Sequence, residues 1–449
     1  MTSPSSQTSR SLIQSVSAAE RLDSRGKPTV QVTLTTEKGR FSSLVPSGAS
    51  KGDYEAIELR DGDNSRYHGQ GVTNAVKNVI DTLGPKLIAK KFCVGTQQRE
   101  IDDFMCELDG SDDKSALGAN AILGISMAVA RAGAAAKGVP LYEHLAQVAD
   151  RNSPYVLPVP FFNVLNGGVH SGNPMAFQEM MVAPVGATSM KEAVRWGSET
   201  YQSLKSIITS KFGKSAIGIG DEGGFAPPTS EPHEALDLLI AAIKDAGHEG
   251  KIKIGVDPAS QEFYEEKSGT YNLGMKWDTA KSLSKEEMRT LYHKLLDKYP
   301  IVLLEDPFGQ DDWEAWTAFN EECPVELVGD DLLATNIRRI EEAHEKKACN
   351  ALLLKINQIG SITESIDAAK RAYELGWSVF VSHRSGETTD DFIADLTVAL
   401  ATGHLKSGSP CRGERVAKYN RLMDIEDELE ARNIPNKFAG VGFRTAHQA

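Results

Sequence analysis

The chain has 449 residues, 40% hydrophobic and 25% charged, which is the composition of a globular protein with room for one large or two ordinary domains. A formal net charge of −13 argues against nucleic acid or an anionic membrane surface as the main partner, and we expect no apolar stretch of the ~20 residues that a membrane helix needs. Five scattered cysteines form no C-x-x-C pair, so they favour neither a zinc site nor a disulfide framework and suggest a reduced, cytoplasmic setting.

The first 17 residues are predicted to form a disordered tail. The segment is rich in serine and threonine and has no acidic residue before Glu20. A transit peptide shares that composition and is the alternative. However, only Arg10 is basic before residue 21, and no basic amphipathic helix is apparent.

Residues 18–152 are predicted to form an α+β domain. Residues 28–45 indicate two strands with a turn at 37–39, because Val30, Val32 and Leu34 alternate with polar residues. Helices are expected over 71–91 and 96–108. The segment 116–135 is apolar all round and rich in Ala and Gly, which is typical of a buried, closely packed helix. Strands followed by helices without alternation favour the α+β class.

Residues 153–449 are predicted to form a catalytic α/β domain, because short apolar runs now alternate with amphipathic helices. The clearest unit is the helix over 361–376, with Ser361 and Glu364 as a capping box and Gly376 as its stop. Roughly 300 residues of this pattern suit a (β/α)8 barrel of the TIM type. An open doubly wound sheet is the alternative, although no G-x-G-x-x-G follows the first strand.

Five apolar runs in this second part each end on an ionisable residue. The runs end at Asp257, Glu305, Asp330, Lys355 and His383, at spacings of 48, 25, 25 and 28 residues. We interpret each step as one strand and one helix, with the 48-residue step doubled by a strand whose end carries no chemical residue. Because all strands of a parallel barrel open on one face, these five side chains are expected to be neighbours.

Three of these residues are carboxylates suited to a metal. Asp257, Glu305 and Asp330 offer the hard oxygen ligands that Mg²⁺ prefers, and the absence of His or Cys beside them disfavours zinc. The alternative for each is a solvated acid at a strand end.

Two lysines accompany the carboxylates. Lys355 follows three leucines, so we expect burial and nearby positive charge to lower its pKa and make it a base. Its alternative role is to pair with the carboxylates. Lys406 lies at another probable strand end, where two lysines would keep one another partly neutral.

The segment His383–Glu387 follows a strand directly and resembles an anion pocket, since Arg384 offers a planar fork and Ser385 a further donor. The glycine-rich stretches 165–174 and 220–228 are interpreted as mobile active-site loops. Within or beside them, His170, Glu222 and Glu179 are the chemical groups. A metal, a lysine base, a carboxylate pair and an anion clamp suit proton abstraction beside a carboxylate and loss of a β group.

The chain resembles the enolase (phosphopyruvate hydratase) family from about residue 18 to 443. The motifs that carry the resemblance are DSRGKPTV, VPSGAS, EAIELRDGD, LGANAILGIS, FFNVLNGGVH, GDEGGFAP, LLEDPF, LLLKINQIG, SHRSGET and LKSGSPCRGER. The resemblance implies an N-terminal α+β domain and a C-terminal barrel of irregular ββαα(βα)6 order. It also implies a homodimer or higher homo-oligomer that converts 2-phosphoglycerate to phosphoenolpyruvate in glycolysis, with two Mg²⁺ per site.

The resemblance assigns a role to each matching residue. Lys355 would remove the C2 proton, and Glu222, helped by Glu179, would protonate the departing hydroxide. Asp257, Glu305 and Asp330 would bind the first Mg²⁺, and Ser50 the second. Arg384 and Ser385 would hold the phosphate, Lys406 and Gln178 would contact the carboxylate end, and His170 and His383 would lie near the leaving group.

Some positions depart from the family pattern. Lys51 stands where the family's SGAST loop has threonine, Lys27 where asparagine is usual, and Pro258 follows the metal candidate Asp257. His68 and Gly309 are also unusual. These departures suggest a divergent paralogue, and Lys51 is expected to alter Mg²⁺ dependence or phosphate affinity. The alternatives are a related lyase or isomerase acting on another phosphorylated or carboxylated acid, and a non-catalytic paralogue.

Overall fold

The computed structural model describes residues 11–48, 52–152, 154–276 and 281–448. Contacts divide the chain into two units. The first comprises residues 1–45, 56–151 and 360–364, and the second comprises 46–55, 152–359 and 365–449. The short segment 46–55 therefore belongs with the second unit. A single domain boundary near residue 152, as predicted from the sequence, does not include this segment.

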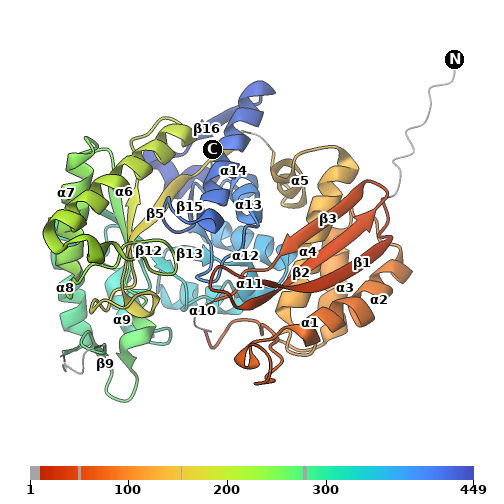
Figure 1. Ribbon diagram of the computed structural model, residues 1–449, viewed down its shortest axis with the longest axis horizontal. Coiled ribbons are helices and arrows are strands. Elements are labelled where there is room, and N and C mark those ends of the chain that lie inside the picture. Colours follow the sequence, from red (N-terminus) through yellow and green to blue (C-terminus); the bar gives the residue numbers. More distant parts are fainter. Residues whose placement is uncertain (1–10, 49–51, 153, 277–280, 449) are drawn as a thin grey trace. The chain divides into compact units, whose positions relative to one another are not determined.

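The first unit contains a three-stranded antiparallel sheet in the order β1-β2-β3 (Figure 1). β2 (Pro28–Thr36) and β3 (Gly39–Leu44) form the predicted hairpin, and β1 (Ser15–Leu22) adds a strand that the sequence pattern does not predict. The predicted disordered tail is therefore wrong over residues 11–17, where Ser11 and Ile13 are buried before β1 begins. β1 pairs with β2 along its whole length, from Ser15 opposite Thr35 to Leu22 opposite Pro28. Most β1 side chains are partly or fully exposed, so its sequence shows little alternation.

Helices cover one face of this sheet. The chain from Thr73 to Lys90 is continuous helix: α1 (Thr73–Lys77), a π-helical stretch η2 (Asn78–Leu83) and α2 (Gly84–Lys90). α3 (Gln98–Asp109) and α4 (Ala119–Lys137) follow, then α5 (Leu141–Val148). A Cβ at Gly124 of α4 would lie 2.6 Å from Val32 Cγ2, so the glycine lets this helix lie directly against β2.

The sequence was expected to contain no apolar stretch as long as a membrane helix. Helix α4 corrects this expectation, because by length and composition alone it could cross a membrane. It is the only such helix among the described residues, and 83% of its apolar window is buried inside the protein. Its burial confirms the expected closely packed core helix, as Ile122, Ile125 and Val129 contact the sheet-side core.

The second unit is built on a closed eight-stranded barrel, in the order β11-β12-β13-β14-β15-β5-β6-β7. In chain order the strands are β5 (Val159–Asn166), β6 (Glu179–Ala183), β7 (Lys253–Asp257), β11 (Ile301–Glu305), β12 (Glu326–Gly329), β13 (Ala351–Leu354), β14 (Ser378–Ser382) and β15 (His404–Lys406). β6 is antiparallel to both neighbours, and the other adjacent pairs are parallel. The barrel excludes the open-sheet alternative.

The expected extra strand in the 48-residue step is wrong. β7 pairs directly with β11, as Ile254 lies opposite Ile301 and Val256 opposite Leu304. The intervening chain forms a small separate sheet of β8 (Tyr264–Glu265), β9 (Thr270–Asn272) and β10 (Ser282–Leu283), followed by α8 (Lys285–Lys298). Chain length alone cannot distinguish such a hairpin excursion from a second barrel step.

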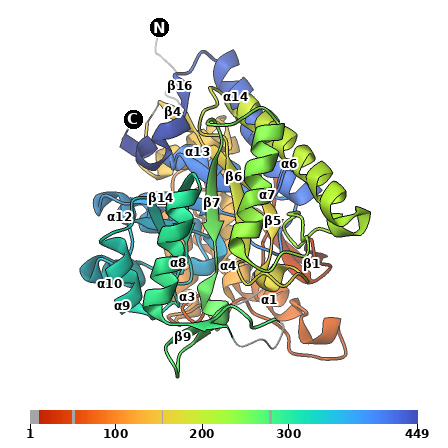
Figure 2. The same cartoon turned by 90° about the vertical axis from the view of Figure 1, so that its left-hand side faces the viewer.

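Helices surround the barrel, and Figure 2 shows β5, β6 and β7 with α6, α7 and α8 around them. The helices of this part of the chain are α6 (Met190–Phe212), α7 (Pro232–Asp245), α8, α9 (Trp313–Asn320), α10 (Ile337–Lys346), α11 (Ile356–Ile359), α12 (Ile362–Glu374), α13 (Phe392–Leu400) and α14 (Gly413–Ala431). The predicted helix at 361–376 is confirmed, since the Glu364 amide donates to Ser361 Oγ and Gly376 has a φ of 77°.

The barrel interior is apolar at mid-height and polar at the amino ends of its strands. Phe161, Leu353 and Phe380 are fully buried in its centre. Below them lie the first residues of three strands, Glu326, Ser378 and His404. Ser378 Oγ donates to Glu326 Oε1, His404 Nε2 lies 3.1 Å from Glu326 Oε2, and the His404 ring stacks on Phe380. This buried polar group closes the end of the barrel opposite the candidate site.

Candidate active site

The predicted strand-end residues meet at the carboxyl end of the barrel. Asp257 and Glu305 are the last residues of β7 and β11, and Lys406 is the last of β15. Asp330, Lys355 and His383 follow β12, β13 and β14 directly. One pocket opens there, lined by Glu55, His170, Gln178, Glu179, Glu222, Asp257, Ala259, Glu262, Asp306, Asp330, Asp331, Lys355, Ser382, His383, Arg384, Ser385 and Lys406.

Glu179 reaches this pocket because β6 is antiparallel. A strand running against its neighbours begins where they end, so the first residue of β6 lies at the carboxyl end of the barrel. The register places Glu179 opposite Asp257 on one side and opposite Asn166 on the other. The sequence reveals the carboxylate, but it does not reveal the strand direction.

Lys406 lies at the centre of a buried carboxylate cluster. Its Nζ is 2.7 Å from Glu305 Oε1, 3.1 Å from Glu179 Oε2 and 3.3 Å from Asp257 Oδ2. Although burial works to lower the pKa of Lys406, these carboxylates raise it well above its usual value. The expectation that the two lysines would keep one another neutral is therefore wrong, because the acids outnumber them.

The three carboxylates of this cluster outnumber the one positive charge that Lys406 supplies. Burial, reinforced by the Asp257 carboxylate, raises the pKa of Glu305 well above its usual value, and burial likewise raises that of Asp257. Glu305 Oε2 is buried and accepts no hydrogen bond within the described part of the chain. Surplus buried carboxylate oxygens of this kind fit a hard divalent cation such as Mg²⁺. Asp257, Glu305 and Asp330 are thus chemically suited to hold one.

A second acidic group adjoins the first. Asp306, Asp330 and Asp331 each offer an oxygen within 4.8 Å of the others. Asp306 adopts a φ of 39°, and its two oxygens accept the amides of Asp330 at 2.8 Å and Asp331 at 2.7 Å. This carboxylate therefore holds the Asp330–Asp331 turn in place. Burial followed by the charge of Asp330 raises the pKa of Asp331 to about 8.

Lys355 contacts Asp330 through its Nζ. Burial works to lower the pKa of Lys355, but the Asp330 carboxylate outweighs burial and raises it above its usual value. The sequence expectation of a lowered pKa is thus wrong, since it omitted this acid one strand away. The proposed alternative, a lysine paired with the carboxylates, describes the contact that the structure shows.

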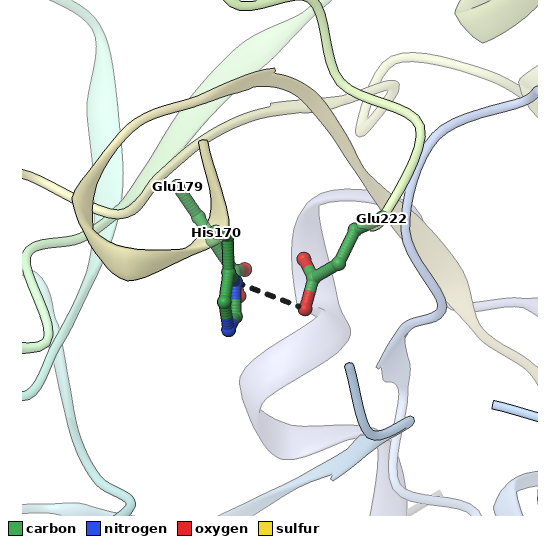
Figure 3. Close-up of side chains that lie close together, drawn as sticks. All are labelled: His170, Glu179 and Glu222. Carbon is green, nitrogen blue, oxygen red and sulfur yellow. Dashed lines mark ion pairs between the residues drawn. The ribbon is translucent and has the colours of Figure 1, made fainter. Parts of the chain in front are cut away.

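Figure 3 shows a carboxyl pair and a histidine at the carboxyl end of the barrel. Glu179 begins β6, which is four places from β13 in the ring of eight strands, so this group lies across the pocket from Lys355. His170 Nδ1 is 3.4 Å from Glu222 Oε1, and Glu179, Glu222 and His170 form a compact group. Burial, followed by the charge of Glu222, raises the pKa of Glu179 to about 7. Burial lowers the pKa of His170 to about 4, so its ring is neutral near pH 7. Near neutral pH Glu179 is therefore partly protonated and can supply a proton.

The turn that carries Glu222 depends on glycine. A Cβ at Gly223, where φ is 87°, would lie 2.3 Å from Ser409 Oγ, and a Cβ at Gly224 would lie 2.7 Å from Asn166 Oδ1. The glycines thus allow close packing of the turn against β5 and the chain after β15. The expected mobility of this loop stays a prediction.

Two side chains missed by sequence reasoning orient the catalytic candidates. Asn163 of β5 donates from Nδ2 to Glu222 Oε2 at 2.7 Å. Arg415 of α14, fully buried, donates to His383 Nδ1 at 2.5 Å and to the carbonyls of Arg384 and Ser385, each at 2.7 Å. Because arginine only donates, His383 must carry its hydrogen on Nε2, which lies 3.6 Å from Glu222 Oε1.

The anion end of the pocket already contains a carboxylate. Arg384 Nη1 is 2.9 Å from Glu55 Oε2, and Nη2 is 3.2 Å from Glu55 Oε1. Arg384 Nη1 also donates to Asn357 Oδ1 at 2.9 Å. Glu55 is a site residue that the sequence did not suggest, since it is far from the strand ends. Ser50 and Lys51 lie outside the described residues.

One unusual residue has a packing explanation. A Cβ at Gly309, after β11, would lie 2.4 Å from Tyr264 Cδ1, so this position accepts only glycine without rearrangement. His68 has a φ of 51°, and nothing in the structure explains Lys27 or Pro258.

Comparison with protein families agrees with the fold and with the acidic pocket. The family described as "Enolase, N-terminal domain" matches residues 13–145, and the family described as "Enolase, C-terminal TIM barrel domain" matches residues 154–447. Together the matches cover nearly the whole chain. With a closed barrel, an antiparallel second strand and metal-competent acids at its carboxyl end, the chain belongs to the enolase family, whose members are Mg²⁺-dependent lyases.

Proposed function

We propose that the chain catalyses the reversible dehydration of 2-phospho-D-glycerate to phosphoenolpyruvate. The supporting observation is that one pocket is lined both by Lys355, which contacts Asp330, and by the Glu179–Glu222 pair. Lys355 follows β13 and Glu179 begins β6, and these two strands are four places apart in the ring of eight, so the groups lie on opposite sides. A β-elimination in which proton and hydroxide leave from opposite faces needs a base and an acid on opposite sides of the substrate.

Lys355 is the proposed base for the C2 proton. In this structure the Asp330 carboxylate stabilises the ammonium form of Lys355. The lysine would become a base once Asp330 contacts another group in its place. Asp257, Glu305 and Asp330 would hold Mg²⁺, which when bound supplies positive charge for the carboxylate that gains a second negative charge. Ser50 is the proposed ligand of the second ion.

Glu222 is the proposed acid for the departing hydroxide, and Glu179 shares its proton. Asn163 Nδ2 holds one Glu222 oxygen, which leaves Oε1 facing His170 and His383. The two histidines are neutral, because burial lowers the pKa of each. They line the leaving-group side without adding a competing charge.

The remaining residues would bind the ends of the substrate. Arg384 and Ser385 are proposed to hold the phosphate, and Lys406 and Gln178 to contact the carboxylate end. Arg415 fixes the backbone of the first pair by its bonds to their carbonyls. The alternative substrate is another phosphorylated carboxylic acid, since the same pocket would accept a different carbon skeleton.

The test is the ultraviolet absorbance of phosphoenolpyruvate formed from 2-phosphoglycerate with Mg²⁺. The parent is expected to turn over, and Lys355→Ala and Glu222→Gln are each expected to lose about 10²–10⁴-fold in kcat. A parent with no turnover would remove the proposed reaction. Undiminished turnover by Lys355→Ala would remove the proposed base.

A further inference from the structure

Glu55 occupies the guanidinium edge that a phosphate would use. Its two oxygens face two different nitrogens of Arg384 at 2.9 and 3.2 Å, which is the bidentate geometry that arginine offers to carboxylate and phosphate alike. The Glu55 and Arg384 side chains are 7% and 6% exposed, so solvent screens this ion pair little.

Among the described residues, the rest of the Glu55 environment adds two hydrogen bonds and no second ion pair. The Gly52 amide donates to Glu55 Oε1 at 3.1 Å, and Gln358 Nε2 lies 3.5 Å from the same atom. Asp331 is close enough for the charge of Glu55 to help raise the Asp331 pKa. Once separated from Arg384, the Glu55 carboxylate would keep these two neutral donors and the nearby Asp331 carboxylate.

Neighbouring residues hold Glu55 in this place. The Tyr54 hydroxyl donates to Asp311 at 3.0 Å, and the guanidinium carbon of Arg339 lies 3.9 Å from the centroid of the Tyr54 ring. Gln310 Nε2 donates to Asp53 Oδ2 at 2.6 Å. With residues 53 and 54 fixed to the barrel unit, the carboxylate of residue 55 stays at a high local concentration beside Arg384.

We infer that Glu55 is an internal competitor for the phosphate site: a phosphate monoester dianion binds Arg384 by displacing the Glu55 carboxylate, which thereby sets the affinity of the site. The inference rests on the proposed phosphate-holding role of Arg384. An internal carboxylate favours ligands that bring more charge or more acceptor oxygens than a single carboxylate does.

The experiment measures the dissociation constant of inorganic phosphate by calorimetry at constant Mg²⁺ and ionic strength. Glu55→Gln keeps the shape of the side chain but weakens its bond to Arg384, because a neutral acceptor replaces a charged one. Phosphate should then bind roughly fivefold to tenfold more tightly. Glu55→Asp, which keeps the charge on a shorter side chain, should bind phosphate with an affinity between the two.

Two controls make the result specific. Asn357→Ala removes a neutral acceptor of Arg384, so it should not tighten phosphate binding. In an Arg384→Gln background, Glu55→Gln should have no effect, since the competition needs the arginine. Unchanged or weaker phosphate binding by both Glu55 variants would overturn the inference and make Glu55 an orienting residue for Arg384.

This outcome is separable from that of the proposed reaction. Tighter phosphate binding in Glu55→Gln without turnover of 2-phosphoglycerate by the parent would retain the competitor and reject the substrate. Turnover by the parent with unchanged phosphate binding in the variants would support the substrate and reject Glu55 as a competitor.

Discussion

Asn163 shows how a buried amide can determine the behaviour of a neighbouring acid. It is fully buried on β5, donates to Glu222 Oε2, and leaves its own Oδ1 without a hydrogen-bond partner in the described structure. An acid held by one oxygen presents the other in a fixed direction, which is the requirement for proton transfer along a short path.

The first prediction concerns this contact. Asn163→Ala should lower kcat for 2-phosphoglycerate about tenfold, because it leaves a buried carboxyl without its donor, while inorganic phosphate affinity at Arg384 stays within twofold. Steady-state kinetics and calorimetry measure the two quantities. Asn436→Ala, a matched substitution on β16 (Asn436–Phe438), should change neither. An unaltered kcat in Asn163→Ala would show that Glu222 needs no such support.

The second prediction concerns the proton on the Glu179–Glu222 pair. With a pKa of about 7 for Glu179, the carboxyl is protonated below that pH and ionised above it. Other buried carboxyls also keep protons, so the measurement is the infrared difference between the parent and Glu179→Gln. The band of a protonated carboxyl in this difference should be present at pH 6 and lost by pH 9. A difference band that persists unchanged to pH 9, or none at pH 6, would contradict this assignment.

The same pKa fixes the direction of a stability effect. The unfolded side chain loses its proton near its ordinary value of 4.5, whereas the folded one keeps it to about 7. Between these values the folded state binds more protons, so the contribution of Glu179 to stability falls as pH rises.

At the scale of the elements, the amino end of the barrel combines buried polar groups with hydrocarbon, since the Phe443 ring lies 5.0 Å from the His404 ring. His404 Nδ1 lies 3.0 Å from the Thr402 carbonyl, to which it donates its hydrogen. His404 Nε2 lies 3.1 Å from Glu326 Oε2, although neither atom has a hydrogen-bond partner among the described residues. Three strands thus meet at one serine hydrogen bond and one close polar approach.

The third prediction follows from this polar group. Glu326→Ala should lower the free energy of unfolding by about 3–5 kcal/mol, because it leaves His404 and Ser378 buried and unpaired. Glu326→Gln should cost less, since its amide can donate to His404 Nε2. Denaturant unfolding measures both. Glu345→Ala on the exposed face of α10 should stay within about 0.5 kcal/mol of the parent. A loss under about 1 kcal/mol for Glu326→Ala would show that water or repacking replaces the carboxylate.

The elements also show why sequence reasoning succeeds in one place and fails in another. Asp257, Glu305 and Lys355 are recognisable because each directly follows its own buried strand, which is a local pattern. The antiparallel direction of β6 depends on which strands flank it, and no local pattern encodes that. Glu55 and Arg415 reach the site from segments remote in sequence, so only the folded chain reveals them. The 48-residue step was misassigned because it was interpreted from its length, which is the same for a hairpin excursion and for a second barrel step.

At the scale of the whole molecule, folding buries more carboxyl groups at the candidate site than its two lysines can pair with. Lys406 balances part of the charge of Glu179, Asp257 and Glu305, and Lys355 balances part of that of Asp330. The surplus charge opposes folding, so a cation bound at this place should stabilise the native state as a whole.

The fourth prediction is that Mg²⁺ raises the midpoint of thermal unfolding and that a chelator reverses the effect. At an Mg²⁺ concentration about 100 times the dissociation constant, the gain is ~2.7 kcal/mol. Scanning calorimetry with and without the chelator measures it. Glu305→Gln should raise the midpoint without Mg²⁺, because it removes buried charge, and should lose most of the response. The same midpoint with and without Mg²⁺ in the parent would contradict a metal role for this cluster.

The reversal of β6 has one more consequence. β6 ends and β7 begins at the amino end of the barrel, yet the intervening chain brings Glu222 to the opposite end. Two packed helices accomplish this: α6 carries the chain up over 23 residues, and α7 returns it over 14. The height of the acid is set where its turn packs on β5 and on the chain after β15, since the Gly224 amide donates to Asn166 Oδ1 and the Ser409 amide donates to the Glu222 carbonyl. The metal candidates are set by strand register instead, so the acid and the metal candidates take their positions from different parts of the fold.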